Sequence, residues 1–300
     1  MLSKTSLGFL IFLISFVGIL ANIFVLRPVY KLAINPKKSS IYVISFFNIL
    51  ADIVNLSQSA FYLAPCIIFE SYIFETENDV GIPKFMGFLI MLIWYIGNIT
   101  QIVMATNRYV VICSNNHKIF TRQKICLIFV VTLVFATVKA YIIEYVFPCC
   151  VFVFDHEILS YSYIRVSEIL NYTDLSDLPL NALSTIVAVI CYTSIIYKIH
   201  KSNKIVIHLI SYKDQKQRRN KEFIYAMQFF SISLFYTFAW VFLRLFPVLF
   251  GGQNAEWFSL IAFCVIINSS ANAFIYLIFN QEISEIIKPS QKQSKIWQIR

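Results

Sequence analysis

The chain has 300 residues, of which 58% are hydrophobic and 14% charged, with a mean hydropathy of +0.70 and a formal net charge of +9. Soluble domains contain about 45–50% apolar residues. This composition excludes an ordinary water-soluble globular domain and favours a lipid bilayer as the solvent for most of the chain.

Seven apolar segments are each long enough to cross about 30 Å of hydrocarbon as a helix. They cover residues 7–26, 41–69, 85–113, 125–147, 178–197, 223–250 and 257–279. A membrane β-barrel is excluded, because its strands would alternate in polarity over about ten residues. We therefore predict an all-α membrane protein: one seven-transmembrane helix bundle spanning residues 1–300, with residues 280–300 as its tail.

The distribution of Lys and Arg predicts the orientation of the bundle. The first, third and fifth connections and the C-terminal tail carry nineteen of the 25 basic residues, whereas the opposite side carries three. Because basic connections stay in the cytosol, we expect an extracellular N-terminus and a cytosolic C-terminus. Removal of the first segment as a signal peptide would reverse this pattern, so we expect it to be retained. The basic connections then face anionic lipid, and we expect no nucleic-acid partner.

Three cysteines and one asparagine on the predicted outer side are candidates for covalent modification. Cys66 is predicted to form a disulfide with Cys149 or Cys150, and the sequence does not choose between them. Asn171 begins an Asn-x-Ser/Thr sequon in an outer connection and is a glycosylation candidate. The other three sequons, at Asn55, Asn98 and Asn268, lie inside predicted spans.

A carboxyl group in the middle of the second span requires polar partners. Asp52 lies at about the same depth as Asn22 in the first span and as Asn268 and Asn272 in the seventh. The last two are four residues apart and therefore share one helix face. A polar cluster that holds water or an ion would satisfy all four. Alternatively, the cluster only holds the helices together.

Four short motifs, each in the matching helix, resemble those of rhodopsin-like G-protein-coupled receptors. They are Ala21-Asn22-x-x-Val25, Leu50-Ala51-Asp52, Asn107-Arg108-Tyr109 and Asn272-Ala273-x-x-Tyr276. A narrower resemblance, over almost the whole chain, is to the nematode serpentine chemoreceptors of class x, with the sister serpentine classes as alternatives. It is carried by residues 105–109, 117–121, 150–155, 220–228 and 279–283.

The resemblance implies a signalling switch at the cytosolic side. The arginine that matches Arg108 contacts an acid at the start of the sixth helix in the silent state and turns toward Gα in the active state. Glu222 matches that acid, because it precedes Trp240 by eighteen residues. The other switch and coupling candidates are Asn107, Tyr109, Asn272 and Tyr276. Asn107 replaces the usual acid, and Gly97 replaces the serine of a sodium-binding receptor, so an ion site at Asp52 is incomplete.

The outer halves of helices three to seven are expected to form the ligand pocket. Trp94 and Trp240 are predicted to face each other beneath a ligand, or else to be packing residues. Lys139 and Arg244 are candidates for charge-assisted bonds to a polar or anionic ligand. The alternatives are that Lys139 snorkels or pairs with Glu144, itself a pocket candidate, and that Arg244 reaches acidic outer connections.

These features predict a G-protein-coupled chemosensory receptor of the plasma membrane, located by resemblance in a sensory cilium. Its partners are a small molecule, a heterotrimeric G protein and the lipid bilayer, with no cofactor or metal. The alternative is a seven-span ligand-gated channel subunit of the odorant-receptor type, which has a cytosolic N-terminus. An enzyme is disfavoured, because an intramembrane aspartyl protease needs two facing aspartates and only Asp52 is deep.

Overall fold

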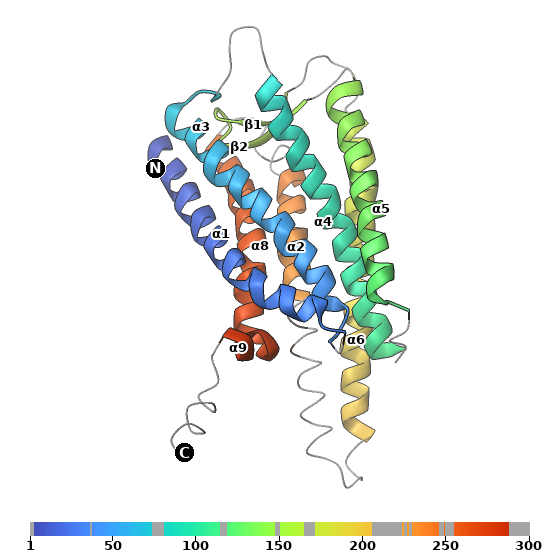
Figure 1. The fold of residues 1–300 in the computed structure, drawn as a ribbon. Helices are drawn as coiled ribbons and strands as arrows, with labels where there is room; N and C mark the ends of the chain where they lie inside the picture. The colour runs from blue at the N-terminus through green and yellow to red at the C-terminus, as the bar shows by residue number, and fades with distance from the viewer. Residues whose placement is uncertain are drawn as a thin grey trace, which may run out of the picture.

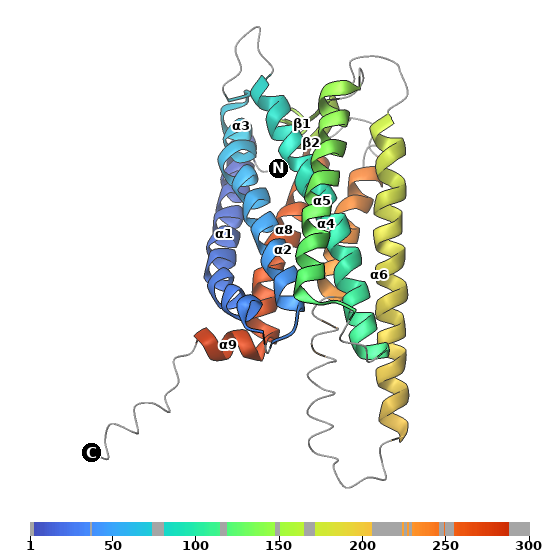
Figure 2. The ribbon, with the colours of Figure 1, turned by 45° about the vertical axis from the view of Figure 1, so that its right-hand side comes forward.

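Long helices make up most of the described chain in the computed structural model (Figures 1 and 2). The structure describes residues 3–36, 38–73, 81–114, 119–147, 151–164, 172–205, 224, 227, 230–245, 249 and 255–287. The α-helices are α1 (Lys4–Ile34), α2 (Ile41–Gln58), α3 (Ala64–Phe69), α4 (Gly81–Cys113), α5 (Arg122–Tyr141), α6 (Tyr172–Ile205), α8 (Ala255–Phe279) and α9 (Gln281–Ile287), with a further helix at Phe230–Leu245. Two π-helical segments, η1 (Ser59–Leu63) and η2 (Ile142–Val146), follow α2 and α5 directly.

Six described helical segments are long and apolar enough to cross a membrane, as an all-α membrane protein requires. They are Lys4–Ile34, Ile41–Phe69, Gly81–Cys113, Arg122–Val146, Ser176–Lys198 and Trp257–Phe279. The helix Phe230–Leu245 is a shorter apolar helix inside the predicted sixth span. Most of the remainder of that span lies outside the described residues. The first helix is longer than predicted: it continues to Ile34 through Pro28.

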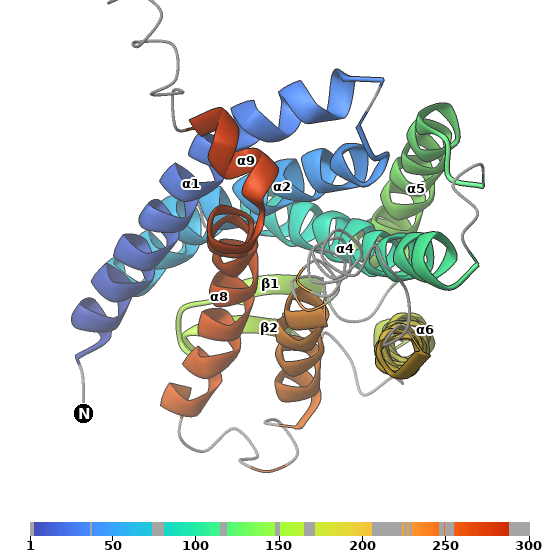
Figure 3. The same cartoon turned by 90° about the horizontal axis from the view of Figure 1, so that it is seen from below.

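The bundle has two ends, which we call the hairpin end and the α9 end (Figure 1). Strands β1 (Val151–Asp155) and β2 (Ser160–Ile164) pair antiparallel at the hairpin end, which is also the end near the N-terminus. The helix α9 lies at the opposite end, where it turns away from α8 and packs near α1 (Figure 3). The Asn280 side chain begins α9 by accepting the backbone N–H of Ile283 at 3.2 Å. The predicted tail therefore starts with a helix that the sequence reasoning missed.

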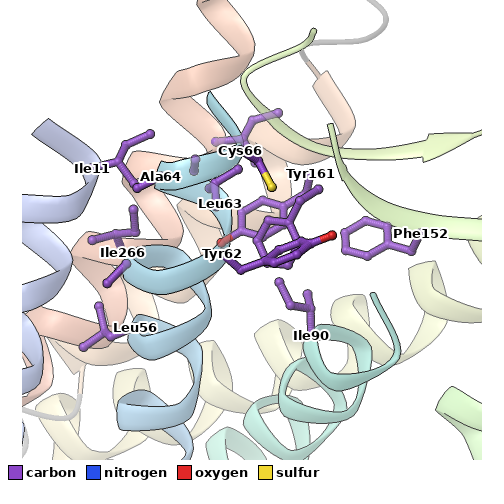
Figure 4. Packing of buried hydrophobic residues seen from close by; sticks show 14 of the residues in the cluster. Ile11, Leu56, Tyr62, Leu63, Ala64, Cys66, Ile90, Phe152, Tyr161 and Ile266 are labelled. Carbon is purple, nitrogen blue, oxygen red and sulfur yellow. The ribbon is translucent and has the colours of Figure 1, made fainter. Parts of the chain in front are cut away.

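The β1–β2 hairpin lies between the predicted spans 125–147 and 178–197 and packs into the bundle. Its side chains Phe152, Phe154 and Tyr161 are at most 4% exposed and join the hydrophobic core of the hairpin end (Figure 4). Asp155 stabilises the turn, because its side-chain oxygen accepts the backbone N–H groups of two turn residues. Alternating aromatic residues thus give the hairpin an apolar face that fills the mouth of the helix bundle.

Candidate functional site

A cavity of about 80 Å³ lies in the interior of the bundle. Its wall is formed by α2, α4, α6, α8, the helix Phe230–Leu245 and the hairpin. Phe152 and Tyr161 line it at the hairpin end, and Asn48, Asp52 and Asn272 line it toward the α9 end. The cavity therefore joins the predicted ligand pocket to the predicted polar cluster.

A network of hydrogen bonds holds one side of the cavity in place. The Trp94 indole nitrogen and the Asn98 amide nitrogen both donate to Oδ1 of Asn181, at 3.1 and 2.9 Å. Ser184 in turn donates to Oδ1 of Asn98 at 2.9 Å. Because these bonds connect α4 to α6 and engage the indole nitrogen, the Trp94 ring has a fixed position.

Trp94 stacks on Tyr236, and this corrects the predicted pairing of Trp94 with Trp240. The ring centroids of Trp94 and Tyr236 are 4.8 Å apart, with an interplanar angle of 27°. The Trp240 indole nitrogen instead donates to the Thr185 hydroxyl on α6 at 3.1 Å, and Trp240 does not line the cavity. Tyr236 lies one helical turn before Trp240, so the aromatic floor is displaced by one turn.

Lys139 is neutralised by Asp177, which corrects the predicted pairing of Lys139 with Glu144. The Lys139 Nζ and Asp177 Oδ1 atoms are 3.0 Å apart, and the Asp177 side chain is 4% exposed. The Tyr95 hydroxyl donates to the same carboxylate oxygen at 2.7 Å, and Lys139 Nζ lies 4.2 Å from the Tyr95 ring centroid. Asp177 precedes the predicted span 178–197 by one residue, but it belongs to the beginning of α6. Since Lys139 is already paired inside the bundle, an anionic ligand would have to displace Asp177.

Glu144 fixes the hairpin rather than pairing with Lys139. Its Oε1 atom accepts the backbone N–H of Phe152 at 3.2 Å, and its side chain is buried. The hairpin also makes a polar contact with η1, where the hydroxyl groups of Tyr161 and Ser59 are 3.3 Å apart. Burial raises the pKa of Tyr161 to about 12, so this hydroxyl is neutral at physiological pH. Arg244, the remaining charged pocket candidate, lines the cavity from the helix Phe230–Leu245.

Asp52 and its predicted partners meet at the inner part of the cavity. Asp52 Oδ2 accepts hydrogen bonds from the amide nitrogens of Asn272 at 2.6 Å and Asn48 at 3.0 Å. Asn22 reaches α8 by donating to the Ser269 carbonyl oxygen at 3.1 Å, without contacting Asp52 through a described hydrogen bond. Asn268 lines the cavity. The geometry thus brings helices α1, α2 and α8 together through polar contacts, as the sequence predicted.

Arg108 lines a second pocket at the α9 end, together with Tyr42, Phe120 and Glu282. Glu282 connects α9 to the start of α2, because it pairs with Lys38 at 3.1 Å and accepts from the Tyr42 hydroxyl at 2.9 Å. The predicted restraint of Arg108, Glu222, lies outside the described residues.

Two buried tyrosines lie near Arg108. They are Tyr192 on α6 and Tyr276 on α8, and both belong to the buried core of the α9 end. The Tyr276 hydroxyl also donates to Ser45 at 2.8 Å. Sequence reasoning missed Tyr192, since a single tyrosine in an apolar run carries no signal of its own. The neighbouring Asn107 is 1% exposed, and neither polar atom of its side chain has a hydrogen-bond partner among the described residues.

The remaining predicted sites are only partly described. Tyr109 is partly buried against the core of the α9 end. Cys66 is fully buried at the hairpin end (Figure 4), whereas Cys149, Cys150 and Asn171 lie outside the described residues. Within the described ranges, no cluster of three or more His, Cys, Asp or Glu side chains has the arrangement of a metal site.

Comparisons with known proteins agree with this architecture. The family described as serpentine type 7TM GPCR chemoreceptor Srx matches residues 12–280. The chain belongs to the Srx family. This membership confirms the resemblance that the motifs around Arg108 and Asp52 indicated, and it is a family of receptors rather than of enzymes.

Squid rhodopsin is similar to this Srx protein in fold. The two chains have 15% sequence identity and a TM-score of 0.74, and the similarity covers 99% of this chain and 86% of squid rhodopsin. At this identity the likeness establishes the seven-helix fold and not the ligand. A search of curated protein sequences found no match.

Proposed function

We propose that this Srx receptor binds a small molecule in the cavity beneath the hairpin and activates a heterotrimeric G protein at the Arg108 pocket. The hairpin end is then extracellular and the α9 end cytosolic, as the Lys and Arg distribution predicts. The receptor is placed in the plasma membrane, and its family resemblance favours a sensory cilium.

The observation that carries this proposal is that a single helix, α8, extends from the wall of the cavity to the neighbourhood of Arg108. Asn272 lines the inner part of the cavity, and Tyr276, one turn later on α8, lies near Arg108. A ligand that shifts α8 would therefore displace Asn272 at the cavity and Tyr276 near Arg108 together. Such coupling between two sites requires only that the ligand binds one conformation of the bundle more tightly than another.

The direct test measures nucleotide exchange. Cells that express the full chain with a panel of Gα subunits are screened with volatile and ascaroside-like compounds. We expect at least one compound to stimulate exchange, and Arg108→Ala to abolish the response while surface expression persists. Lys124→Ala is the matched control, because it removes an exposed basic residue at the same end that lines neither pocket.

The channel alternative makes different predictions. A tag at the N-terminus of a channel of that type would be stained only after cells are permeabilised, whereas we expect staining of intact cells. Ligand-evoked current without any G protein, together with unchanged exchange in Arg108→Ala, would contradict the proposal.

A further inference from the structure

The pocket that contains Arg108 at the α9 end has a volume of about 800 Å³, which is within the usual range for a site that binds a small molecule or a headgroup. It lies where the α1–α2 connection meets the beginning of α5, at the edge of the bundle (Figure 3). Its wall includes the basic side chains of Lys38 and Arg122 and the hydroxyl groups of Ser39 and Thr121. The pocket is therefore built largely from segments at the periphery of the bundle.

The described wall of this pocket has more positive than negative charge. Its charged side chains are three cations and one carboxylate, namely Lys38, Arg108, Arg122 and Glu282. Glu282 pairs with Lys38 at 3.1 Å. The Arg122 guanidinium donates to the carbonyl oxygens of Asn35 and Lys38 and forms no ion pair with any described residue. Because a carbonyl group has no net charge, the pocket keeps an excess of positive charge that attracts an anion.

Arg122 is held in place and still has donors to offer. Both of its described hydrogen bonds use the Nη2 atom and fasten α5 to the α1–α2 connection. The N–H groups on Nε and Nη1 donate to no described residue. The side chain is partly exposed, so an anion can reach it. A guanidinium binds two oxygens of a phosphate group at once, because its N–H groups form a planar fork.

Two hydroxyl groups of the wall are also placed as donors. Ser39 Oγ accepts the backbone N–H of Ile41, and Thr121 Oγ1 accepts the backbone N–H of Lys124, both at 3.4 Å. A hydroxyl group can accept and donate together, so each O–H group is left to donate to an occupant of the pocket. Ser39 and Thr121 are both exposed. These donors and Arg122 together suit an anion with several oxygen acceptors, such as a phosphate group.

The position of α5 indicates that such a phosphate group belongs to a lipid. The exposed apolar side chains of this helix begin with Leu127, which is 63% exposed, and continue with Val130 and Val134, which are each 60% exposed. Arg122 precedes Leu127 by five residues, or about 7.5 Å along the helix axis. This distance places the guanidinium beyond the hydrocarbon, at the depth of the headgroups. A lipid whose chains lie along α5 would bring its headgroup to the pocket.

We propose that this pocket binds the headgroup of a phosphoinositide, a lipid whose inositol ring carries phosphate monoester groups. Arg122 binds one phosphate group through Nε and Nη1, and the hydroxyl groups of Ser39 and Thr121 donate to its other oxygens. Basic pockets between helices on the cytosolic side suit this class of lipid. Arg108 is 6% exposed, so the headgroup occupies the accessible rim of the pocket and leaves Arg108 to the Gα subunit.

Phosphatidylserine fits this pocket less well than a phosphoinositide. Its single phosphate group is a diester with one negative charge, and its ammonium group would approach the cations Lys38 and Arg122. The inference rests on the proposed function only in taking the α9 end as cytosolic, which is where phosphoinositides would meet the receptor.

The test measures lipid binding to the purified full-length receptor in neutral detergent by native mass spectrometry. The probe is a phosphatidylinositol bisphosphate, and it is compared with phosphatidylserine, phosphatidylinositol without added phosphate groups, and soluble inositol trisphosphate. We expect the bisphosphate lipid to bind at least about ten-fold more tightly than each of the other three, since it combines charge-assisted hydrogen bonds with chains that pack along α5.

Two substitutions test the residues of the rim. Arg122→Gln removes the cationic fork and should weaken binding of the bisphosphate lipid at least about ten-fold. Ser39→Ala leaves Arg122 and its bonds in place and should weaken binding several-fold. Lys124→Gln is the matched control, because it removes one exposed positive charge from the same helix outside the pocket, and we expect it to leave the affinity unchanged. The melting temperature of each variant shows whether the fold persists.

Several results would overturn the inference. Equal binding of phosphatidylserine and the bisphosphate lipid would show that net charge alone attracts lipid. Equal affinities of Arg122→Gln and Lys124→Gln for the bisphosphate lipid would place it elsewhere, as would an unchanged affinity of Ser39→Ala. If soluble inositol trisphosphate bound as tightly as the lipid, the pocket would be a site for a free phosphate compound.

The assay contains neither the receptor's ligand nor a G protein, so the two proposals fail separately. A receptor that prefers the bisphosphate lipid but activates no Gα would contradict the proposed function and leave this inference intact. A receptor that activates Gα without any preference for the bisphosphate lipid would contradict this inference alone.

Discussion

The carbonyl oxygen of Phe152 occupies the space that a side chain at Gly87 would need. A Cβ atom on Gly87 would lie 1.7 Å from that oxygen, which is far inside van der Waals contact. The hairpin backbone therefore rests directly on α4, and only glycine permits this approach. In rhodopsin-like receptors a third-helix cysteine anchors this connection, but the matching position here is Pro83.

Gly87→Ala is expected to displace the hairpin and weaken ligand binding by about ten-fold or more, because relief of the overlap costs about 1–3 kcal/mol. The measurement is ligand affinity in membranes at equal surface expression. Ile82→Ala is the control, because this residue of α4 is 39% exposed and does not line the cavity. Normal affinity in Gly87→Ala would contradict the role of this close approach.

Glu144 is predicted to act through hydrogen bonding to the hairpin and not through its charge. Glu144→Gln keeps an acceptor for the Phe152 N–H and should retain most of the receptor's thermal stability. Glu144→Leu leaves that buried N–H without a partner, which should cost about 1–3 kcal/mol and lower the melting temperature. If Gln and Leu were equally harmful, a direct ionic role of Glu144 would be the better explanation.

The Lys139–Asp177 pair is expected to be structural. Lys139→Met leaves a buried carboxylate without its counter-charge, and we expect a loss of about 3–5 kcal/mol in the free energy of unfolding. The double variant Lys139→Met/Asp177→Asn should recover much of this loss, because the amide oxygen of the substituted side chain would still accept the Tyr95 hydroxyl. Thermal unfolding of purified receptor measures both.

An exposed ion pair at the same end gives the comparison. Lys4 and Glu70 are 3.1 Å apart, with side chains that are 43% and 57% exposed, so Lys4→Met should change stability by less than about 1 kcal/mol. If Lys139→Met reduced ligand affinity at unchanged stability, Lys139 would be a ligand contact instead.

The positions of helices and of deep polar residues could be predicted from the sequence, because the bilayer imposes both. A carboxyl group at mid-span needs a partner at the same depth, and depth can be counted along a helix. This reasoning found Asp52 and Asn272, whose side chains meet at 2.6 Å. It also found the apolar limits of the second span, which the structure places at Ile41–Phe69.

Contacts that depend on the residue at which a connection ends and the next helix begins could not be predicted in this way. Asp177 lies just outside the predicted span 178–197, because the apolar run begins one residue later. In the structure, α6 starts at Tyr172, and Asp177 consequently reaches Lys139 inside the bundle. The hairpin was missed for a similar reason: strands as short as five residues, with burial that comes from the helix bundle, leave little periodic signal.

The spacing to Trp240 also gave an aromatic floor that was one turn out of place. The number of residues between two motif positions of a family, such as Glu222 and Trp240, identifies which residue faces the cavity only if the helix winding does not change between them. Trp94 stacks on Tyr236 instead. Which of two neighbouring aromatic residues on one helix enters the cavity depends on packing that the sequence alone does not express.

Tyr192 is predicted to transmit ligand binding to the Arg108 pocket without taking part in ligand binding. Tyr192 is 1% exposed and is not among the residues that line the cavity. Its hydroxyl group lies near the Arg108 guanidinium. Removal of this hydroxyl should therefore alter the equilibrium between silent and active states and leave the ligand pocket intact.

We expect Tyr192→Phe to reduce ligand-stimulated nucleotide exchange several-fold, because it removes the polar hydroxyl group near the Arg108 guanidinium, with little change in ligand binding to the receptor alone. Tyr197→Phe is the matched control on the same helix, because the Tyr197 side chain is 66% exposed and lines neither pocket. Equal ligand-stimulated nucleotide exchange in the two variants would show that the Tyr192 hydroxyl does not transmit ligand binding to the Arg108 pocket. A parallel fall in ligand affinity of Tyr192→Phe would instead place its effect on the packing of α6 against α4.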